Sequence, residues 1–579
     1  MHRRLFVPLS AVAVLLFAAC GPAASPTAAP TAAVAAPTAT PAAKATPLPG
    51  TTPGPTPKPT TAPTAAPAGP KLGGTVRHPQ REEPPSWDPS RSHVDPAATT
   101  KYLVFTKLIT AWSDNPQNCQ SQAYPWGVQT WKWVDDTTAE FVLRQGIRYH
   151  NKPPVNGREA VAQDVVLAFD RYKKNLSYMA GKSALIDSVT ATDKYTFRIK
   201  TKSPWGSMVT ELLAHFYGPW LEAAEAGGAN GELWEQPTKS WIGSGAFMFE
   251  SWLPGVKWRV VRNPDYWIKG RPYLDAVEAM VMPDASTQLA ALRSGQLNLI
   301  REFNEEMLDV AVRERPNLQV ARCPGTTMSG AGVLWMNNSG PPFNDARVRR
   351  AVVMSIDQAT LIKSLYKGRA QPSMTLPAVV QYSMKLDDYP PEVRPFLQYS
   401  PAQAKQLLAE AGFPNGLDTV INFSPRYSAP APMVAEAVAG MLGAVGIRAK
   451  LNMMEYGRYS TTVLQAKYPV GELAISPRTV NTPEDNHGLF AFSSGAGATN
   501  RSVVNDPEFD KLYNDFRATT GDKKRLEQAR QLQIMVASKA YAAWLPLTDS
   551  AMTAAPGLHF IWVGNTRDYS MLMETAWME

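Results

Sequence analysis

The chain has 579 residues, more than one hydrophobic core usually serves, so two or three domains are expected. Its formal net charge is +8, and lysine and arginine are spread along the chain, which argues against a nucleic-acid-binding surface. Three cysteines without a Cys-x-x-Cys pair give no support to a zinc ribbon or a thioredoxin-type site.

The N-terminus has the features of an export signal. Arg3 and Arg4 precede an apolar stretch, residues 5–19, which is too short to span a bilayer as a helix. Residues 16–20 (LFAAC) resemble a bacterial lipobox, in which Cys20 becomes the lipid-bearing first residue of the mature protein. A plain secretory signal is the alternative, and the arginine pair leaves Sec and twin-arginine export both open.

Residues 20–70 are predicted to form a lipidated cysteine followed by a linker. The stretch from Gly21 to Pro70 holds 14 of the 51 prolines, and alanine and threonine fill most of the rest. Such a composition cannot bury a core and favours a semi-extended spacer, so it reads as a stalk between a membrane and a folded body.

The folded body begins with alternating strand and helix signals. A strand is expected at 71–76, a helix at 102–109, a strand at 138–144 and a helix that begins near Asp164. A hairpin is expected over 188–200.

The stretch 242–300 carries the densest pattern. Strands are expected at 246–252 and 256–262 around a Pro-Gly turn, and a third at 277–282. A short helix at 286–293 and a strand at 297–300 follow. Strand, helix and strand in this order predict a βαβ unit with a parallel pair.

The last third predicts a second βαβ unit, with strands at 419–423 and 447–453 around a helix at 433–445. Asn344 or Asp345 is expected to cap one helix, and Ser400 another. Ligands commonly bind in clefts beside or between such α/β units.

No catalytic constellation is found. The seven histidines form no HExxH pair, and neither a GxSxG elbow nor a P-loop is present. We expect His150 to be structural, and Glu484, Asp485 and His487 to form a polar loop rather than a metal site. An enzyme is therefore not expected, and no cofactor.

Several blocks resemble the large solute-binding proteins of ABC transporters, of the oligopeptide and dipeptide type (family 5). They include RQGIRYHNKPPVNGREAVAQDVVLAF, GSGAFMFESWLPG, RNPDYW and PPFNDARVRRAVVMSID, in the family's order from Lys71 onward. The resemblance implies an α/β, periplasmic-binding-protein-like fold (type II, cluster C), with two α/β lobes and an extra smaller domain around a hinged ligand cleft.

On this resemblance we divide the chain into domains. Residues 1–19 are the signal peptide and 20–70 the linker; 71–115, 240–322 and 550–579 form lobe I; 116–239 form the extra domain; 323–549 form lobe III. The expected function is an importer receptor on the outer side of the bacterial membrane, held by a lipid anchor. Its partners are a peptide or other small solute and ABC permease subunits, without nucleic acid, and the protein is expected to be a monomer. Binding of an oligosaccharide, or a surface sensor of the same fold, is the alternative.

The candidate ligand-binding residues follow from the loops that border the cleft in relatives; they are His93, Asp95, Tyr382, Ser476, Arg478, Thr479 and Asn481. Peptide binders of this family usually carry an aspartate, which takes the peptide's ammonium group, in the run that corresponds to residues 473–485. This chain lacks the early acidic residue of that run. Arg478 stands near that place and would suit a carboxylate or phosphate, unless it points to solvent. Cys119 and Cys323 form a disulfide or remain two buried thiols; both alternatives are open.

Overall fold

A computed structural model gives the fold. It describes residues 69–91, 95–112, 122–175, 180–214, 218–228, 231–301, 305–325, 331–378, 380–425, 431–478, 482–488, 500–560 and 573–579. The chain divides into two units, 1–67 and 68–579, and all described residues belong to the second. The predicted signal peptide, Cys20 and most of the linker therefore lie outside the described residues.

The first sheet has the strand order β1-β12-β11-β10. Its strands are β1 (Thr75–Gln80), β10 (Phe247–Leu253), β11 (Lys257–Arg262) and β12 (Ala276–Val281), with α1 (Asp95–Val104) and α4 (Pro237–Ser240) nearby. β10 and β11 form the predicted hairpin. The aromatic side chains of Trp87, Trp241 and Phe249 pack edge to face in its core, with centroids 5.2–5.4 Å apart.

The predicted parallel pair within 242–300 is wrong. β12 pairs in parallel with β1, from Thr75 opposite Ala276 to Gln80 opposite Val281, and antiparallel with β11. Because both edges of β12 are occupied, β13 (Leu299–Arg301) joins another sheet, β13-β22-β14. That sheet contains β14 (Gln319–Cys323) and β22 (Ser550–Ala554), and α5 (Ala285–Arg293) and α6 (Glu305–Glu314) lie in the same segment.

The predicted helix at 102–109 is also wrong in its second half. α1 ends at Val104, and β2 (Thr106–Lys107) and β3 (Ile109–Trp112) follow. Thr106 pairs with Leu221 in β9 (Trp220–Leu221), and Ile109 pairs with Pro125 in β4 (Gln122–Pro125). Tertiary pairing thus overrides the local helix pattern.

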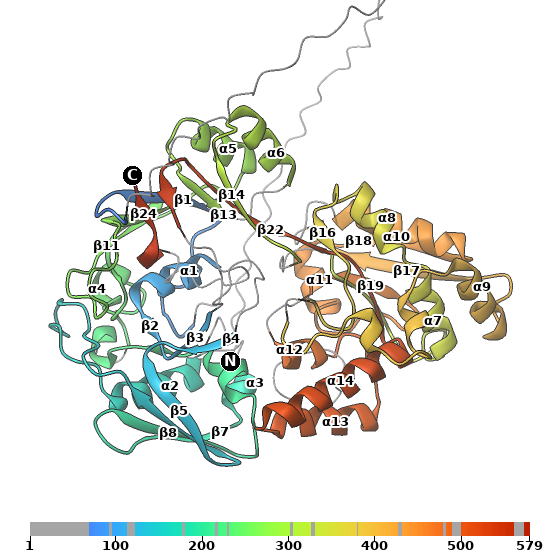
Figure 1. The fold of residues 1–579 in the computed structure, drawn as a ribbon, viewed down its shortest axis with the longest axis horizontal. Helices are drawn as coiled ribbons and strands as arrows, with labels where there is room; N and C mark the ends of the chain where they lie inside the picture. Colours follow the sequence, from blue (N-terminus) through green and yellow to red (C-terminus); the bar gives the residue numbers. More distant parts are fainter. Residues whose placement is uncertain are drawn as a thin grey trace, which may run out of the picture. The chain divides into compact units, whose positions relative to one another are not determined.

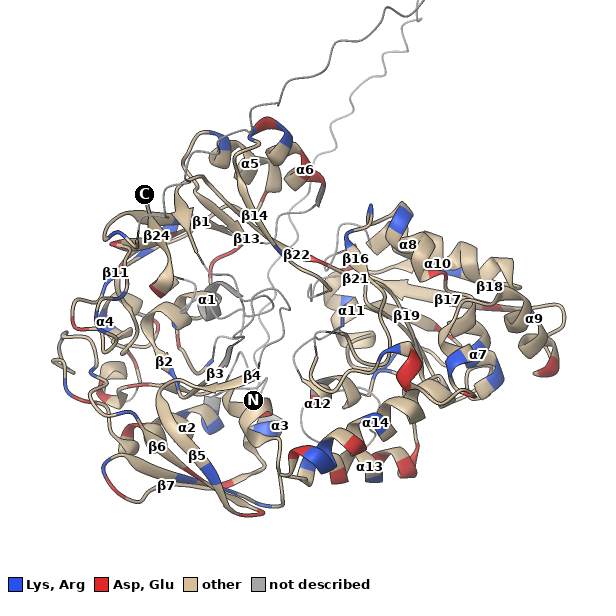
Figure 2. Cartoon of the chain, viewed as in Figure 1, with Lys and Arg blue, Asp and Glu red and all other residues tan. Residues whose placement is uncertain are grey.

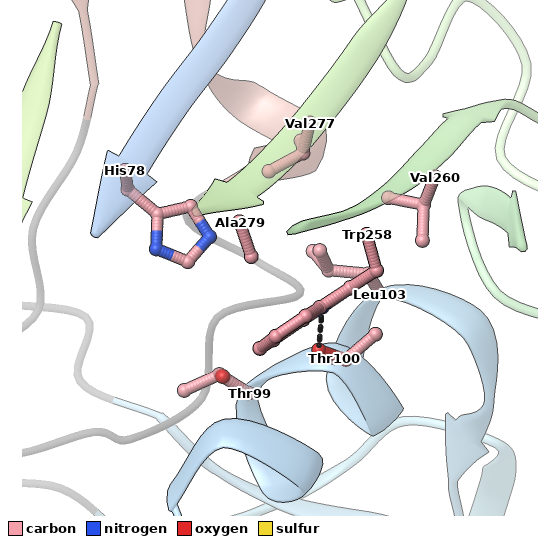
Figure 3. A pocket seen from close by; sticks show the side chains of 8 residues that line it. All are labelled: His78, Thr99, Thr100, Leu103, Trp258, Val260, Val277 and Ala279. Atoms are coloured by element: carbon pink, nitrogen blue, oxygen red, sulfur yellow. Dashed lines mark hydrogen bonds between the residues drawn. The ribbon is translucent and has the colours of Figure 1, made fainter. Parts of the chain in front are cut away.

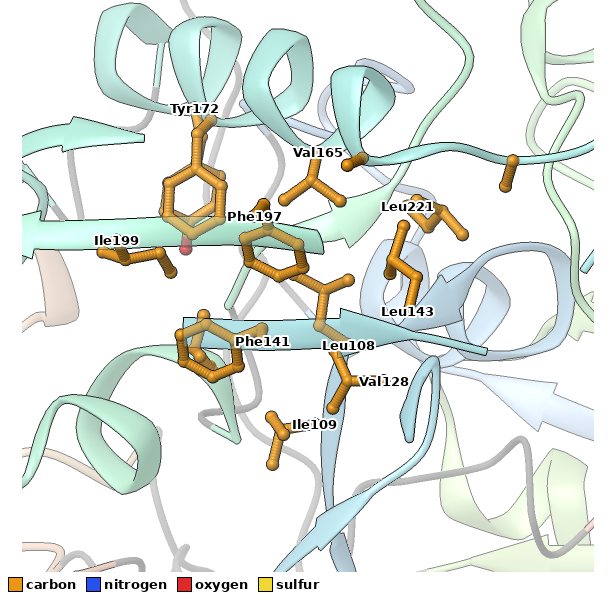
Figure 4. Close-up of a cluster of buried hydrophobic side chains, with 14 of the residues drawn as sticks. Leu108, Ile109, Val128, Phe141, Leu143, Val165, Tyr172, Phe197, Ile199 and Leu221 are labelled. Carbon is orange, nitrogen blue, oxygen red and sulfur yellow. The ribbon is translucent and has the colours of Figure 1, made fainter. Parts of the chain in front are cut away.

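A third sheet, β5-β6-β8-β7, lies in the predicted extra domain. It contains β5 (Val128–Asp135), β6 (Thr138–Leu143), β7 (Ile186–Ala191) and β8 (Thr196–Thr201), and α2 (Ala162–Asn175) and α3 (Ala180–Ser183) accompany it. Phe141 and Phe197 stack with their centroids 5.1 Å apart, and Val165 of α2 packs in the same cluster (Figure 4). His150 is buried, and its Nε2 donates to the carbonyl oxygen of Gly245 at 3.1 Å.

The fourth sheet has five strands in the order β18-β17-β19-β15-β20. They are β15 (Val333–Met336), β17 (Leu417–Phe423), β18 (Ile447–Met453), β19 (Leu473–Ser476) and β20 (Ala542–Trp544). Its helices are α7 (Ala346–Met354), α8 (Gln358–Ser364), α9 (Pro401–Glu410), α10 (Ala431–Ala444), α11 (Tyr456–Thr462), α12 (Pro483–His487), α13 (Pro507–Ala518) and α14 (Asp522–Lys539) (Figure 1). β17 and β18 pair in parallel, so the second predicted βαβ unit is confirmed.

Helix starts in this region are partly as predicted. Asp345 caps α7, because its carboxylate accepts from the backbone N–H of Arg347 at 2.8 Å. Ser400 precedes α9, but its side chain makes no capping hydrogen bond, so that predicted contact is wrong. The predicted polar loop at 484–487 is instead the short helix α12.

Two connections join the five-stranded sheet to β13-β22-β14. β14 leads toward β15, and β21 (Leu547–Thr548) leads into β22; β21 also pairs with β16 (Ala370–Gln371). The connections touch, because Gly325 N–H donates to Asp549 Oδ1 at 2.9 Å. The chain ends with β23 (Leu558–His559) paired to β24 (Trp577–Met578).

Candidate functional site

The five-stranded sheet has one edge at which four strands end. β17 is parallel to β18 and β19, and β15 is antiparallel to both β19 and β20. The carboxyl ends of β17, β18, β19 and β20 therefore lie at one edge, which we call the carboxyl edge. Open α/β sheets bind ligands outside the carboxyl ends of their strands.

Ser476 is the last residue of β19 and lies at the carboxyl edge. Its Oγ accepts a hydrogen bond from Trp335 Nε1 at 2.6 Å and one from Arg501 Nη1 at 3.3 Å. The Arg501 guanidinium also lies 6.0 Å from the Trp335 ring centroid. Ser476 is buried, whereas Arg501 is partly exposed. Arg501 is therefore a cation whose guanidinium lies at this edge and which is not fully buried.

Arg478 lies two residues further on and is 2% exposed, so the alternative that it points to solvent is wrong. Its guanidinium donates to Ser373 Oγ (2.7 Å), to Asn486 Oδ1 (3.1 Å) and to the carbonyl oxygens of Met374 and Thr375. Burial lowers its pKa to about 9. Since four of five N–H donors are used within the protein, Arg478 holds the 373–375 segment against the sheet.

Arg478 also stacks on an aromatic ring. Its guanidinium lies 4.2 Å from the ring centroid of Trp544, the last residue of β20. Val333 pairs with Ser476 on one side and with Trp544 on the other. The packing allows no side chain at Gly332, since an added Cβ would lie 2.8 Å from Arg478 Cβ. Ser476, Arg478 and Trp544 are thus brought together by three neighbouring strands.

Two buried side chains near the carboxyl edge have polar atoms without a hydrogen-bond partner. Ser424 directly follows β17, is 4% exposed, and its Oγ is unpartnered. Because Asn422 pairs with Ala474, the same register continued by two residues places Ser424 beside Ser476. His487 is 0% exposed and neither ring nitrogen has a partner. Burial, with the nearby charge of Arg478, lowers the His487 pKa to about 3.

The remaining predicted site residues are placed as follows. His93, Thr479 and Asn481 lie outside the described residues, and Asp95 begins α1 but its side chain is not described. Tyr382 is half-buried at φ 67° and packs against the cluster that contains Trp335 and Trp544. Burial raises the pKa of Tyr382, and its carbonyl oxygen accepts from Gln533 Nε2 at 2.9 Å. Its ligand role stays a prediction.

Sequence reasoning missed Arg501 and Ser424. Ser424 could have been found, because it follows the predicted strand 419–423 at its carboxyl end. Arg501 had no comparable signal, since it comes close to Ser476 only through the folded chain.

A narrow gap without room for a water molecule lies beside β12, lined by His78, Thr99, Thr100, Leu103, Trp258, Val260, Val277 and Ala279 (Figure 3). Thr100 Oγ1 accepts from Trp258 Nε1 at 2.8 Å, and Thr99 Oγ1 accepts from Gln80 Nε2 at 3.0 Å. Burial lowers the His78 pKa to about 4. The space is smaller than usual ligand pockets, so we treat it as a packing gap.

Two further features bear on function. Among the described residues, no three His, Cys, Asp or Glu side chains are grouped as metal ligands. The helices of that same part of the chain include none with the length and apolar character needed to cross a bilayer. Cys323 is disulfide-bonded, and both other cysteines, Cys20 and Cys119, lie outside the described residues.

Comparison with known proteins agrees with a binding role for this fold. Heme-binding protein A of Haemophilus influenzae is 27% identical over 447 residues, which cover 73% of this chain and 78% of that protein. The dipeptide-binding protein of Escherichia coli is 25% identical over 447 residues, covering 73% and 80%. The solved structure of DppA from Helicobacter pylori, in complex with the peptide STSA, matches with a TM-score of 0.68 at 22% identity, covering 88% of this chain and 99% of that chain.

The fold is that of the type II periplasmic binding proteins, so the expected fold class is confirmed. The family model of bacterial extracellular solute-binding proteins, family 5 Middle, matches residues 122–499, more than half of the chain. The chain belongs to this family. It is a solute-binding receptor of an ABC importer, and an extracytoplasmic location accompanies the family.

Proposed function

We propose that the protein captures a peptide-like or other small polar solute at the carboxyl edge and delivers it to the permease subunits of its importer. The observation that carries this is the presence of unpartnered polar atoms on Ser424, which the strand register places beside Ser476, and on His487, which lies near Arg478. Buried polar groups are nearly always hydrogen-bonded, so an unpartnered set at this edge suits a ligand that supplies the partners.

The two touching connections suit a hinge. Sheets β13-β22-β14 and β18-β17-β19-β15-β20 are joined by the segments around Gly325 and Asp549. A few residues at element ends can absorb the backbone change of domain closure. Closure of the proposed lobes I and III over the solute would shield the carboxyl edge from water. The boundaries 71–115, 240–322 and 550–579 against 323–549 remain our proposal.

The mode of attachment is proposed from the N-terminus alone. Export by the signal at 1–19 and lipidation of Cys20 would leave the body on the outer side of the membrane, tethered by the Pro-rich linker. A tethered monomer, without nucleic acid or a cofactor, is sufficient for this role. The relatives named above bind heme, a dipeptide or a peptide, and those ligands define the first solutes to test.

Thermal unfolding of the purified mature protein in the presence of pooled solutes tests the proposal. Pools of di- to pentapeptides, oligosaccharides and heme cover the classes considered. A cognate solute should stabilise the protein by about 2.7 kcal/mol at a hundredfold excess over Kd. Absence of any thermal shift, together with unchanged uptake of the same pools in cells that lack the protein, would contradict the receptor role.

A further inference from the structure

The carboxyl edge carries an unbalanced positive charge. Arg478 and Arg501 flank Ser476, and neither guanidinium forms an ion pair with a carboxylate anywhere in the described part of the chain. Arg525 differs, because it donates to the carboxylate of Glu484.

Glu484 is the acidic side chain on α12, next to this region. Its carboxylate is 1% exposed and takes its charge-assisted hydrogen bond from Arg525 on α14. The second oxygen, Oε2, has no partner. Because Arg525 neutralises Glu484, this carboxylate does not balance Arg478 or Arg501 as well.

The unpartnered groups at the edge are suited to donate. Arg501 Nε–H is buried without an acceptor, although its Nη1 reaches Ser476. The Ser424 hydroxyl and one N–H of the neutral His487 ring also lack acceptors. A guanidinium with free N–H groups beside a hydroxyl is a suitable environment for a carboxylate or phosphate, which accepts several hydrogen bonds at once.

A cationic group would be disfavoured at the same place. Arg501 and Arg478 would repel it, and the buried carboxylate of Glu484 already has Arg525 as its cation. The polar groups there would also remain without acceptors. Charge repulsion and hydrogen-bond donors left without acceptors would both disfavour a cationic solute, so the site would discriminate between anionic and cationic solutes.

Resting on the proposed function, we infer that the solute presents an anionic group, a carboxylate or a phosphate, to Arg501 at the carboxyl edge, with Ser424 and Ser476 beside it. The solute is therefore selected by its negative end. Arg478 is buried and does not contact the solute; it contributes through its charge and by holding the 373–375 segment.

The test uses pairs of probes that differ in the charged group they carry. N-acetylated tripeptides with a free carboxylate are compared with the same N-acetylated peptides as C-terminal amides, and with C-amidated peptides that keep a free ammonium. Glucose 6-phosphate against glucose provides the phosphate arm. Binding is measured by thermal shift and then by calorimetry on the mature protein.

We expect the anionic members to bind at least tenfold more tightly than their neutral or cationic partners. Arg501→Gln should lower affinity for the anionic probes tenfold or more, and Arg501→Lys should give an intermediate loss. The control is Arg458→Gln, an exposed arginine on α11 near the same edge, which should leave affinity unchanged. The melting temperature of each ligand-free variant reports whether it is folded.

Preference for neutral or cationic probes would overturn the inference and leave the receptor function standing. Equal affinity of Arg501→Gln and the parent for the anionic probes would overturn it too. Lack of binding by every probe would also count against it, and uptake by cells that lack the protein would then decide on the receptor function separately.

Discussion

The carboxylate of Glu211 accepts two hydrogen bonds from Arg517, 306 positions later in the sequence, at 3.3 Å from Nε and 3.2 Å from Nη2. Glu211 lies in the π-helical turn Val209–Leu213, and Arg517 lies in the last turn of α13. Trp205 Nε1 donates to the same carboxylate at 2.9 Å. This pair joins the predicted extra domain to the predicted lobe III.

The contact around Glu211 is close as well as charged. Ser207 N–H donates to the Arg517 carbonyl oxygen at 3.3 Å. An added Cβ at Gly206 would lie 2.0 Å from the Thr519 carbonyl oxygen, so only glycine fits there. Lys182 adds a second cation, 3.9 Å from Glu211. The acidic and basic residues of α13 and α14 are visible in Figure 2.

Arg517→Met should lower the free energy of unfolding by roughly 3 to 5 kcal/mol, because it leaves the buried charge of Glu211 without its main partner. Urea denaturation of the mature protein measures the change. Lys511→Met is the matched control on the same helix. Its pair with Asp515, at 2.6 Å, has side chains 78% and 50% exposed, so a change within about 0.5 kcal/mol is expected. Equal effects of the two substitutions would contradict the argument.

His487 should make the protein less stable in acid. The folded protein holds this ring neutral, with a pKa lowered to about 3, whereas the unfolded chain binds a proton below the ordinary value of 6.5. The neutral ring therefore contributes stability above pH 6.5, and the contribution is lost as pH falls from 6.5 toward 3.

Replacing this histidine tests the predicted direction of the pH dependence of stability. In His487→Leu, the slope of unfolding free energy against pH between 6 and 4 should decrease by up to about 1.4 kcal/mol per pH unit. Urea midpoints measured across this range give the slope. An unchanged slope in the variant would mean that His487 binds a proton as readily in the folded protein as in the unfolded chain.

Arg478→Lys should destabilise the fold although it keeps the charge. A lysine cannot reproduce the fork that reaches Ser373, Met374, Thr375 and Asn486, so a loss of roughly 1.5 to 3 kcal/mol is expected by thermal or urea unfolding. Arg448→Lys is the control. Its pair with Asp418 has side chains 56% and 78% exposed and should change stability by less than about 0.5 kcal/mol. A fully stable Arg478→Lys protein would exclude the holding role.

The partner of Cys323 is predicted to be Cys119. A non-reducing peptide map should contain one peptide pair linked through these two residues, and Cys323→Ser should lower stability by roughly 2 to 5 kcal/mol. A linked pair containing Cys20 would instead contradict both this pairing and the lipidation of Cys20.

Cys20 is predicted to carry the lipid. Cys20→Ser should move the protein from the membrane fraction to the soluble extracytoplasmic fraction, because the variant lacks the thiol that would carry the lipid. Cell fractionation followed by mass spectrometry of the mature N-terminus measures this. Continued membrane association of the variant would show that another attachment exists.

Local sequence patterns predicted the structure correctly where the interacting residues are close together in the sequence. The βαβ unit from Leu417 to Met453 and the cap at Asp345 depend on neighbours in the sequence, and the structure contains both. Local patterns failed where a distant strand competes. The sequence allows β12 to pair in parallel with either β13 or β1, and only the fold determines that β1 is the partner.

The sequence by itself determined the family, because the order and spacing of the family's blocks can be read from the sequence without a structure. The family in turn determined the fold class and the receptor role. The sequence also indicated that an acidic residue usual in the peptide binders of the family is missing after β19, and that Arg478 stands near its place. Only the tertiary structure decided what that arginine does. Arg478 turns inward because carbonyl oxygens from 373–375 and the ring of Trp544 meet it there, and Arg501 reaches the carboxyl edge from a segment 25 residues beyond Ser476. Such encounters depend on how separate elements pack, which no local pattern encodes.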